Sequence, residues 1–220
     1  MIFRVRILKG IRFPKTSAWG LRESEAITGL WSRVATVILA STLLFGIGGL
    51  FGAGSESLSG RIASLSEAEF EAAKLFFLAG QLLSGILYAV ILLFFFGLFI
   101  YILFDIEYKK VLVVQLIAVV FGLAGKAVSI LLAVTAGLGN SASPLSLGVL
   151  GHYLTDFEPL QNFLGQISFF QAAVIAFQFY FYQSLSEKKR GWILLILILL
   201  HLLFWAIQAV LLSTNLGKFL

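Results

Sequence analysis

Five apolar runs, charge-free except for Lys126 in the third, are each long enough or nearly long enough to cross a lipid bilayer. The runs are 34–51, 75–104, 111–137, a segment within 160–185, and 192–213. About 20 helical residues cross a hydrocarbon core of about 30 Å, and each run meets or nearly meets that length. The runs are continuously apolar, which excludes barrel strands, in which polar and apolar residues alternate. The pattern therefore predicts an all-α integral membrane protein with a five-transmembrane-helix bundle.

The second run is too long for the bilayer core, so its helix is expected to tilt or to project beyond the membrane. Ser66 and Glu69 precede this run with the spacing of a capping box, in which each side chain accepts a hydrogen bond from the backbone N–H of the other. We therefore expect the helix to begin outside the bilayer. The 138–161 loop is long for a helix connection and is expected either to lie on the membrane surface or to re-enter it.

The composition agrees with this class of protein. Apolar residues make up 60% of the 220 residues and charged residues 12%, whereas soluble domains hold roughly 45–50% and about 25%. Cysteine is absent, which excludes a disulfide framework and thiol or cysteine-based metal chemistry. The formal net charge is +5, but the basic residues lie at the ends of the predicted helices, so we expect no nucleic-acid partner.

Lysine and arginine are distributed unevenly between the two sides of the predicted bundle. Seven lie before the first run, two in the loop after the second and three in the loop after the fourth, whereas the opposite side holds three. The cytoplasmic side of a membrane protein carries the excess of lysine and arginine. The N-terminus is therefore predicted to be cytoplasmic and the C-terminus outside, in a bacterial cytoplasmic membrane.

Residues 1–30 form a basic cytoplasmic N-terminal segment ahead of a membrane domain at 31–214. Basic side chains are interspersed with apolar ones in this segment, and anionic lipid headgroups attract such segments at about 1 kcal/mol per basic residue. Two interpretations stay open, lipid binding or a role in topology alone, and in both the segment is expected to be separable from the bundle. The candidate lipid-headgroup contacts are Arg4, Arg6, Lys9 and Arg12.

Polar residues inside the predicted spans are the candidate functional residues. At 3.6 residues per turn, those of each helix fall on one face, so that they form stripes along the third, fourth and fifth helices. Hydrogen bonding between packed helices explains such stripes most simply, and a path for a ligand or an ion is the alternative. The candidate interior polar cluster consists of Lys126, Gln115, Ser129, Gln171, Gln178, His201 and Gln208.

Lys126 is the one charged residue inside an apolar run. An intramembrane lysine costs about 2.5–3.5 kcal/mol on insertion scales and marks a functional site by default. A lysine can snorkel to the headgroups, but side chains lean toward the N-terminus of their helix, which is cytoplasmic here. The sequence therefore favours a Lys126 that faces the interior of the bundle, with snorkelling to the outer headgroups as the alternative.

The chain lacks the motifs of the common intramembrane enzymes. His152 and His201 are the only histidines, and neither stands in an H-E-x-x-H metalloprotease motif. No G-x-S-x-G nucleophile elbow occurs. Asp105 and Asp156 fall at opposite membrane edges, which excludes an aspartyl dyad. We therefore expect no enzymatic activity, no cofactor and no metal site.

Several short segments outside and between the predicted spans form a family-like pattern: Leu-Ser-Glu-Ala-Glu-Phe-Glu at 65–71 with 74–80 after it, Tyr-Lys-Lys at 108–110, Ser-Leu-Gly at 146–148 with Pro159, Ile-Ser-Phe-Phe at 167–170, and 186–190. With these segments the chain resembles, between about residues 19 and 213, the bacterial branch of the Yip (Ypt/Rab-interacting protein) membrane family. The resemblance implies a five-helix bundle with a cytoplasmic N-terminus and a non-catalytic role in binding other membrane proteins.

The resemblance also sets the expected function. Eukaryotic members associate with Rab-type GTPases, but their Asp-Leu-Tyr-Gly-Pro signature is missing here, so GTPase binding is not carried over. Some bacterial members accompany ABC-type exporters that protect cells from toxic peptides. The leading expectation is a non-enzymatic accessory or assembly partner of such a complex. The alternative is a small transporter or channel that uses the interior polar residues.

Two features bear on partners and on the choice between these functions. The pairs Gly48/Gly52 and Gly49/Ala53 have the spacing of small residues at helix contacts, which predicts packing within the chain and, as an alternative, a homo-oligomer. A continuous wet path to Lys126 and His201 would favour the transporter or channel. A dry and fully packed interior would favour the accessory protein.

Overall fold

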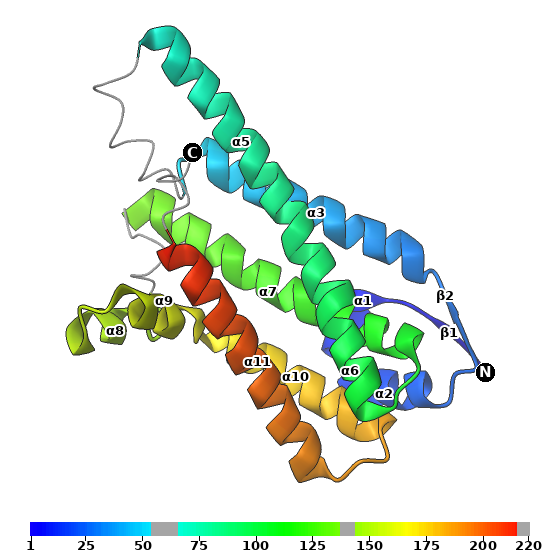
Figure 1. Ribbon diagram of the computed structural model, residues 1–220. Helices are drawn as coiled ribbons and strands as arrows, with labels where there is room; N and C mark the ends of the chain where they lie inside the picture. The colour runs from blue at the N-terminus through cyan, green and yellow to red at the C-terminus, as the bar shows by residue number, and fades with distance from the viewer. Residues whose placement is uncertain (54–65, 137–143, 215–220) are drawn as a thin grey trace.

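The computed structural model describes residues 1–53, 66–136 and 144–214 (Figure 1). Apart from two strands of three residues each, the elements in this part of the chain are helices, which confirms the all-α class. In chain order the elements are β1 (Ile2–Arg4), α1 (Ile7–Arg12), α2 (Pro14–Arg22), β2 (Ala26–Thr28), α3 (Leu30–Leu50), α5 (Glu67–Val90), the π-helix η2 (Ile91–Phe95), α6 (Phe96–Phe104), α7 (Tyr108–Ala136), α8 (Gly148–Leu154), α9 (Glu158–Gln166), α10 (Phe169–Leu185) and α11 (Arg190–Ser213).

The long helices make the protein a multi-pass membrane protein. Among the described residues, four helical segments are long and apolar enough to cross a bilayer: Leu30–Leu50, Glu67–Phe104, Tyr108–Thr135 and Arg190–Ser213. The fourth predicted span corresponds to α10, which has 17 residues and is shorter than these. Successive long helices run in opposite directions, so their connections alternate between the two ends of the bundle (Figure 1).

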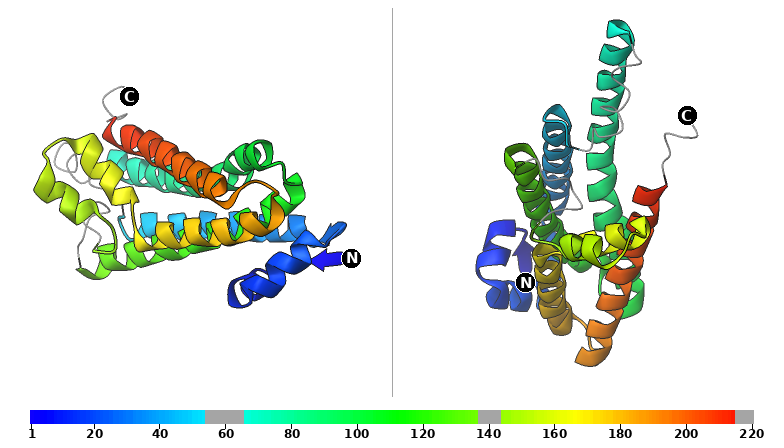
Figure 2. Two further views of the ribbon diagram at one scale, coloured as in Figure 1. Left: turned by 90° about the horizontal axis from the view of Figure 1, so that it is seen from below. Right: turned by 90° about the vertical axis from the view of Figure 1, so that its left-hand side faces the viewer.

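The second span is one continuous helix made of α5, η2 and α6. It starts with the predicted capping box, in which Glu69 Oε2 accepts a hydrogen bond from the Ser66 backbone N–H at 2.9 Å. A π-helical turn leaves part of the backbone ladder unpaired, and here the Tyr108 hydroxyl donates to the Phe94 carbonyl at 3.2 Å. Its 38 residues give a length of about 57 Å, and its first turns project from the bundle (Figure 2).

Glycines allow α3 and α5 to pack closely along their length. At Gly85 an added Cβ would lie 2.7 Å from the Thr42 Cα and 2.8 Å from the Ser41 carbonyl oxygen. The Ser41 hydroxyl donates to the Gly85 carbonyl at 2.7 Å, so the contact is both close and hydrogen-bonded. Gly49 lies against Gln81 of α5, so the small residues of α3 serve packing within the chain.

Residues 1–29 form a compact unit at one end of the bundle, which we name the N-terminal unit (Figure 1). β1 pairs in parallel with β2, and α1 and α2 supply the crossover that parallel strands require. Gly10 of α1 lies against Ile117 of α7, and α2 packs on α10. Instead of a separable segment, the unit is docked on the bundle, because its apolar residues, such as Val5 and Leu21, are buried there.

At the opposite end, α8 and α9 lie across the ends of the membrane helices (Figure 2). A short antiparallel bridge between Ser146 and Ser168 joins the start of this segment to the start of α10. The Asn162 amide of α9 donates to the Ser213 hydroxyl at 3.1 Å, which ties α9 to the end of α11. α9 thereby covers this end of the bundle beside α11.

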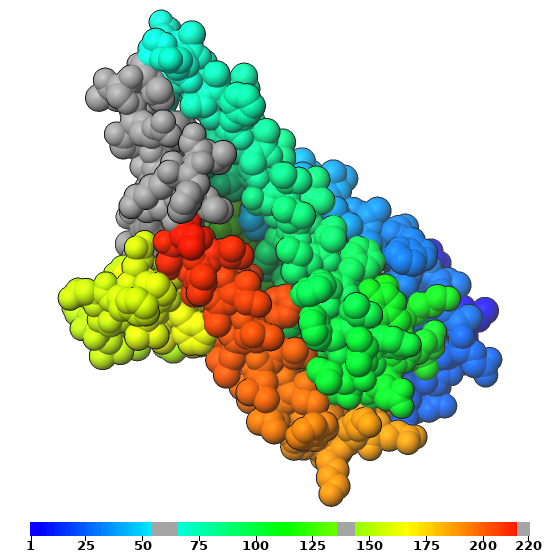
Figure 3. Space-filling model, in the orientation of Figure 1, coloured from blue at the N-terminus to red at the C-terminus, as the bar shows by residue number. Residues whose placement is uncertain are grey.

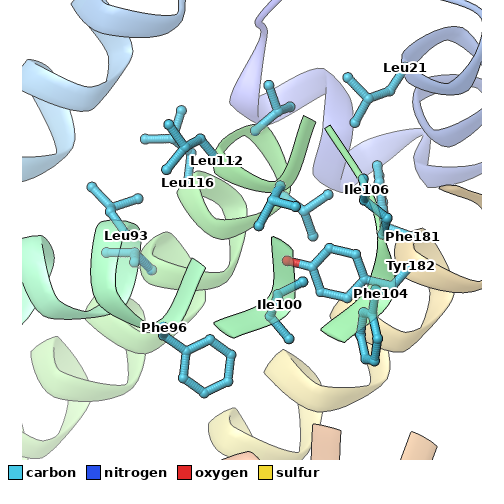
Figure 4. Close-up of a cluster of buried hydrophobic side chains, with 14 of the residues drawn as sticks. Leu21, Leu93, Phe96, Ile100, Phe104, Ile106, Leu112, Leu116, Phe181 and Tyr182 are labelled. Atoms are coloured by element: carbon cyan, nitrogen blue, oxygen red, sulfur yellow. The ribbon is translucent and has the colours of Figure 1, made fainter. Parts of the chain in front are cut away.

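The end of the bundle next to the N-terminal unit has a dense apolar core (Figure 4). Side chains from α6, α7 and α10 meet there with side chains from the N-terminal unit. Because this packing fills the space between the helices, it closes the bundle at that end. The fully buried large side chains include Leu21, Leu93, Ile100, Phe104, Leu112, Leu116, Phe181 and Tyr182.

Candidate functional site

Beyond this core the interior of the bundle is hollow. A cavity of about 560 Å³ lies between α5, α7, α10 and α11, and α9 contributes to its wall. Its lining runs along α7 from Gln115 to Ser129, which is about 21 Å at 1.5 Å per residue. Pockets for small molecules typically measure about 300–1,000 Å³. The cavity therefore has the size of a binding site for a small organic molecule.

The cavity brings the whole candidate polar cluster together. All seven residues line it, although they come from three different helices. The stripes on α7, α10 and α11 thus face one another across an open space. The lining residues of the cluster are Gln115, Lys126 and Ser129 on α7, Gln171 and Gln178 on α10, and His201 and Gln208 on α11.

A chain of hydrogen bonds forms the floor of the cavity. Gln178 Nε2 donates to Gln115 Oε1 at 3.1 Å, and Gln115 Nε2 donates to the Tyr182 hydroxyl at 3.1 Å. These three side chains are at most 2% exposed. Gln178 Oε1 is buried and has no hydrogen-bond partner within the described residues. An unpaired buried acceptor is costly, so this oxygen is an unsatisfied polar atom within the floor.

His201 forms a side wall next to this floor. Its Nδ1 lies 2.9 Å from the Leu197 carbonyl, which can only accept, so Nδ1 carries the proton. The ring lies edge-on to Phe96 and Trp205, with ring centroids 4.9 Å and 5.8 Å away. This leaves Nε2 as the ring atom free to accept a hydrogen bond at the cavity.

Lys126 lies on the cavity wall rather than on the outside of the bundle. Its Nζ is 5.2 Å from the centroid of the Phe45 ring, which is a cation–π distance. Within the described residues, Nζ has no hydrogen bond and no ion pair, and no aspartate or glutamate lines the cavity. The ammonium group is therefore a positive charge that the described part of the chain leaves without a counter-ion.

The cavity has a side opening between α5 and α11. Phe204 of α11 packs against Phe95 and Phe96, with ring centroids 6.2 Å and 5.0 Å away. Beyond that level α5 and α11 do not pack along each other, and a recess separates them (Figure 3). Ser84 and Leu87 of α5 and Gln208 and Leu211 of α11 line the cavity.

Several lining residues lie outside the predicted cluster. Tyr88 shares a helical face with Ser84 and Gln81, but only Tyr88 and Ser84 line the cavity, because Gln81 packs against α3. Asn162 and Gln166 reach the cavity from α9. In the sequence these two residues are marked only by the polar face of the 158–166 segment. That pattern does not indicate which helix ends the segment covers.

The other sequence candidates lie far from the cavity. The basic side chains proposed for lipid headgroups are exposed on the N-terminal unit, as such a contact requires. No group of three or more histidine, cysteine, aspartate or glutamate side chains that could hold a metal ion occurs in the described residues. The exposed basic residues are Arg4, Arg6, Lys9 and Arg12.

Comparisons with known proteins do not extend this description. No family model, no curated protein and no solved structure matches the chain. The resemblance to the Yip family therefore stays a prediction, and the function is argued below from the cavity.

Proposed function

We propose that this protein crosses a bacterial cytoplasmic membrane five times and binds a small molecule inside its helix bundle, as a small transporter or channel does. The observation that carries the proposal is the cavity of about 560 Å³, whose lining includes the whole polar cluster. Both Lys126 and His201 line this cavity. A wet path to these two residues is the feature that favours a transporter or channel over an accessory protein. A hollow interior that is lined by polar side chains as well as apolar ones favours ligand binding over simple helix packing.

The hydrogen bonds of the cluster support the same choice. If its polar residues served only to join helices, their side chains would be expected to pair with one another. Gln115, Gln178 and Tyr182 do so. Lys126 makes no hydrogen bond or ion pair with any described residue, and Gln178 keeps an unpaired oxygen. The accessory role at an exporter is motivated by the family resemblance and by the missing catalytic motifs, and it does not call for such a cavity.

The fifth crossing is assigned to α10. Its 17 residues measure about 26 Å, close to the hydrocarbon thickness of about 30 Å. It packs against α7 and α11, and its polar residues face the cavity rather than lipid. With this crossing, the basic turns that precede α7 and α11 lie on the same side as the basic N-terminal unit, which the positive-inside rule places in the cytoplasm.

Cysteine labelling tests whether the cavity is wet and accessible. The chain has no cysteine, so Ser129→Cys and Ser84→Cys each place one thiol on the cavity lining. Ala124→Cys is the matched control, because Ala124 is exposed on α7 but does not line the cavity. A charged, water-soluble methanethiosulfonate should modify the two cavity thiols in liposomes and spare the control. If neither cavity thiol reacts, the interior is dry and the proposal fails.

A further inference from the structure

We propose that the ligand of the cavity is an amphipathic organic anion, with its acidic head at Lys126 and its apolar part extending toward His201. This inference rests on the proposed function, since it names the class of molecule that the cavity binds. Three features of the described residues carry it: an uncompensated positive charge, an apolar sleeve next to that charge, and a side opening toward the bilayer.

The charge is the first feature. Lys126 is the only charged residue among the described residues that line the cavity, and these residues supply it with no hydrogen bond or ion pair. A charge in a low-dielectric interior requires a partner, and the ring of Phe45 at 5.2 Å supplies only part of that stabilisation. A carboxylate or phosphate head would complete it, whereas a cationic ligand would be repelled.

The apolar sleeve is the second feature. Between the level of Lys126 and the floor at Gln115, α7 rises by 11 residues, or about 16 Å. Leu92, Val119 and Trp205 are among the apolar side chains that line the cavity. A small hydrophilic anion would leave this surface without a partner. An anion with an apolar chain of medium length would cover it.

The side opening is the third feature. α5 and α11 diverge beyond Phe204, and the outward surfaces of both helices are rich in exposed apolar side chains such as Leu83 and Leu203. The recess between them in Figure 3 would thus face lipid acyl chains in a membrane. An amphiphile dissolved in the bilayer can enter by this route without passing through water, which a fully polar solute cannot do.

Trp205 provides a reporter within the cavity. It lines the cavity and is 7% exposed, whereas Trp19, Trp31 and Trp192 are 59%, 62% and 53% exposed and do not line it. A variant with phenylalanine at those three positions reports on the cavity alone. A variant that keeps only Trp192 reports on the surrounding bilayer and is its matched control.

The test uses two probes with the same bromine-bearing chain, 12-bromododecanoate and the neutral 12-bromododecanol, in nanodiscs of neutral lipid. Bromine quenches tryptophan fluorescence at short range. The carboxylate should quench Trp205 saturably, at a concentration in the bilayer about tenfold lower than the alcohol. Lys126→Met should abolish this preference, and Lys126→Arg should retain it. Quenching of the exposed Trp192 corrects for unequal partitioning of the probes into the bilayer, and retention of the preference in Lys126→Arg separates loss of charge from loss of structure at this position.

Each other outcome overturns the inference in a distinct way. Equal and saturable quenching of Trp205 by both probes would mean that the cavity binds neutral amphiphiles as well as anionic ones. The proposed function would then stand, but the preference for an anionic ligand would be refuted. A preference that persists in Lys126→Met would place the anionic head elsewhere. If neither probe quenches Trp205 saturably, the cavity does not accept amphiphiles, and the cysteine labelling alone then decides whether it binds polar solutes.

Discussion

The contact between α3 and α5 at Gly85 gives a quantitative prediction about stability. In Gly85→Ala the new Cβ would meet backbone atoms of Ser41 and Thr42 at 2.7–2.8 Å, so the two helices must move apart. Overpacking of this kind costs about 1–3 kcal/mol. The hydrogen bond from Ser41 to the Gly85 carbonyl is lost as well, at about 0.6 kcal/mol for a typical bond between membrane helices.

Gly80 provides the matched control on the same helix. It is exposed, and an added Cβ there meets nothing within 4 Å. Both variants gain the same helix propensity, about 1 kcal/mol for alanine over glycine, so this gain cancels when the two are compared. The clash and the lost bond remain, and Gly85→Ala should be less stable than Gly80→Ala by about 1.6–3.6 kcal/mol.

Steric trapping in bicelles measures the free energy of unfolding of a membrane protein without removing it from lipid. We expect Gly80→Ala to equal or exceed the native protein in this assay and Gly85→Ala to fall below it. The Ser41→Ala variant, which removes the hydrogen bond without a clash, should lie between the two glycine variants. Equal free energies of unfolding for Gly80→Ala and Gly85→Ala would refute the close contact between α3 and α5.

Three further predictions concern the topology, the helix start and the floor of the cavity. A tag at the C-terminus should be accessible only from outside, and a cysteine at Ser186 should be labelled only from inside; the reverse result would mean a different number of crossings. Ser66→Ala should speed amide exchange in the first turn of α5, and Ser66→Asp should restore protection, because Asp is also a good N-cap; unchanged exchange in Ser66→Ala would count against the capping box. Gln115→Leu breaks two hydrogen bonds and should cost about 1.2 kcal/mol, twice the cost of Tyr182→Phe, which breaks one; similar unfolding free energies for these two variants would contradict the hydrogen-bonded floor.

Much of the secondary structure could be predicted from the sequence, because in lipid the backbone must satisfy its own hydrogen bonds and apolar runs therefore become helices. The 192–213 run corresponds to α11, and the 75–104 run ends with α6 at Phe104. The early start of α5 was also predictable, because the hydrogen bonds of a capping box are local. The stripes on α7, α10 and α11 follow from helical period in the same way.

Other features depend on contacts between segments that are distant in the sequence. The N-terminal unit is an example, because its basic residues indicated an independent segment, while its docking depends on Gly10 matching Ile117 and on a buried Leu21. The packing of Gln81 on α5 is another such feature. Its side chain is covered by α3 only because the glycines of α3 allow the two helices to approach closely.

The sequence by itself determined that the chain is a helical membrane protein and which polar residues share a face of each helix. Only the tertiary structure decided that these faces enclose a cavity instead of packing together. The physical reason is that hydropathy does not distinguish an apolar surface facing lipid from one facing another helix. The space between α5, α7, α10 and α11 is set by how their side chains fit, and it stays open because α5 and α11 do not pack along each other.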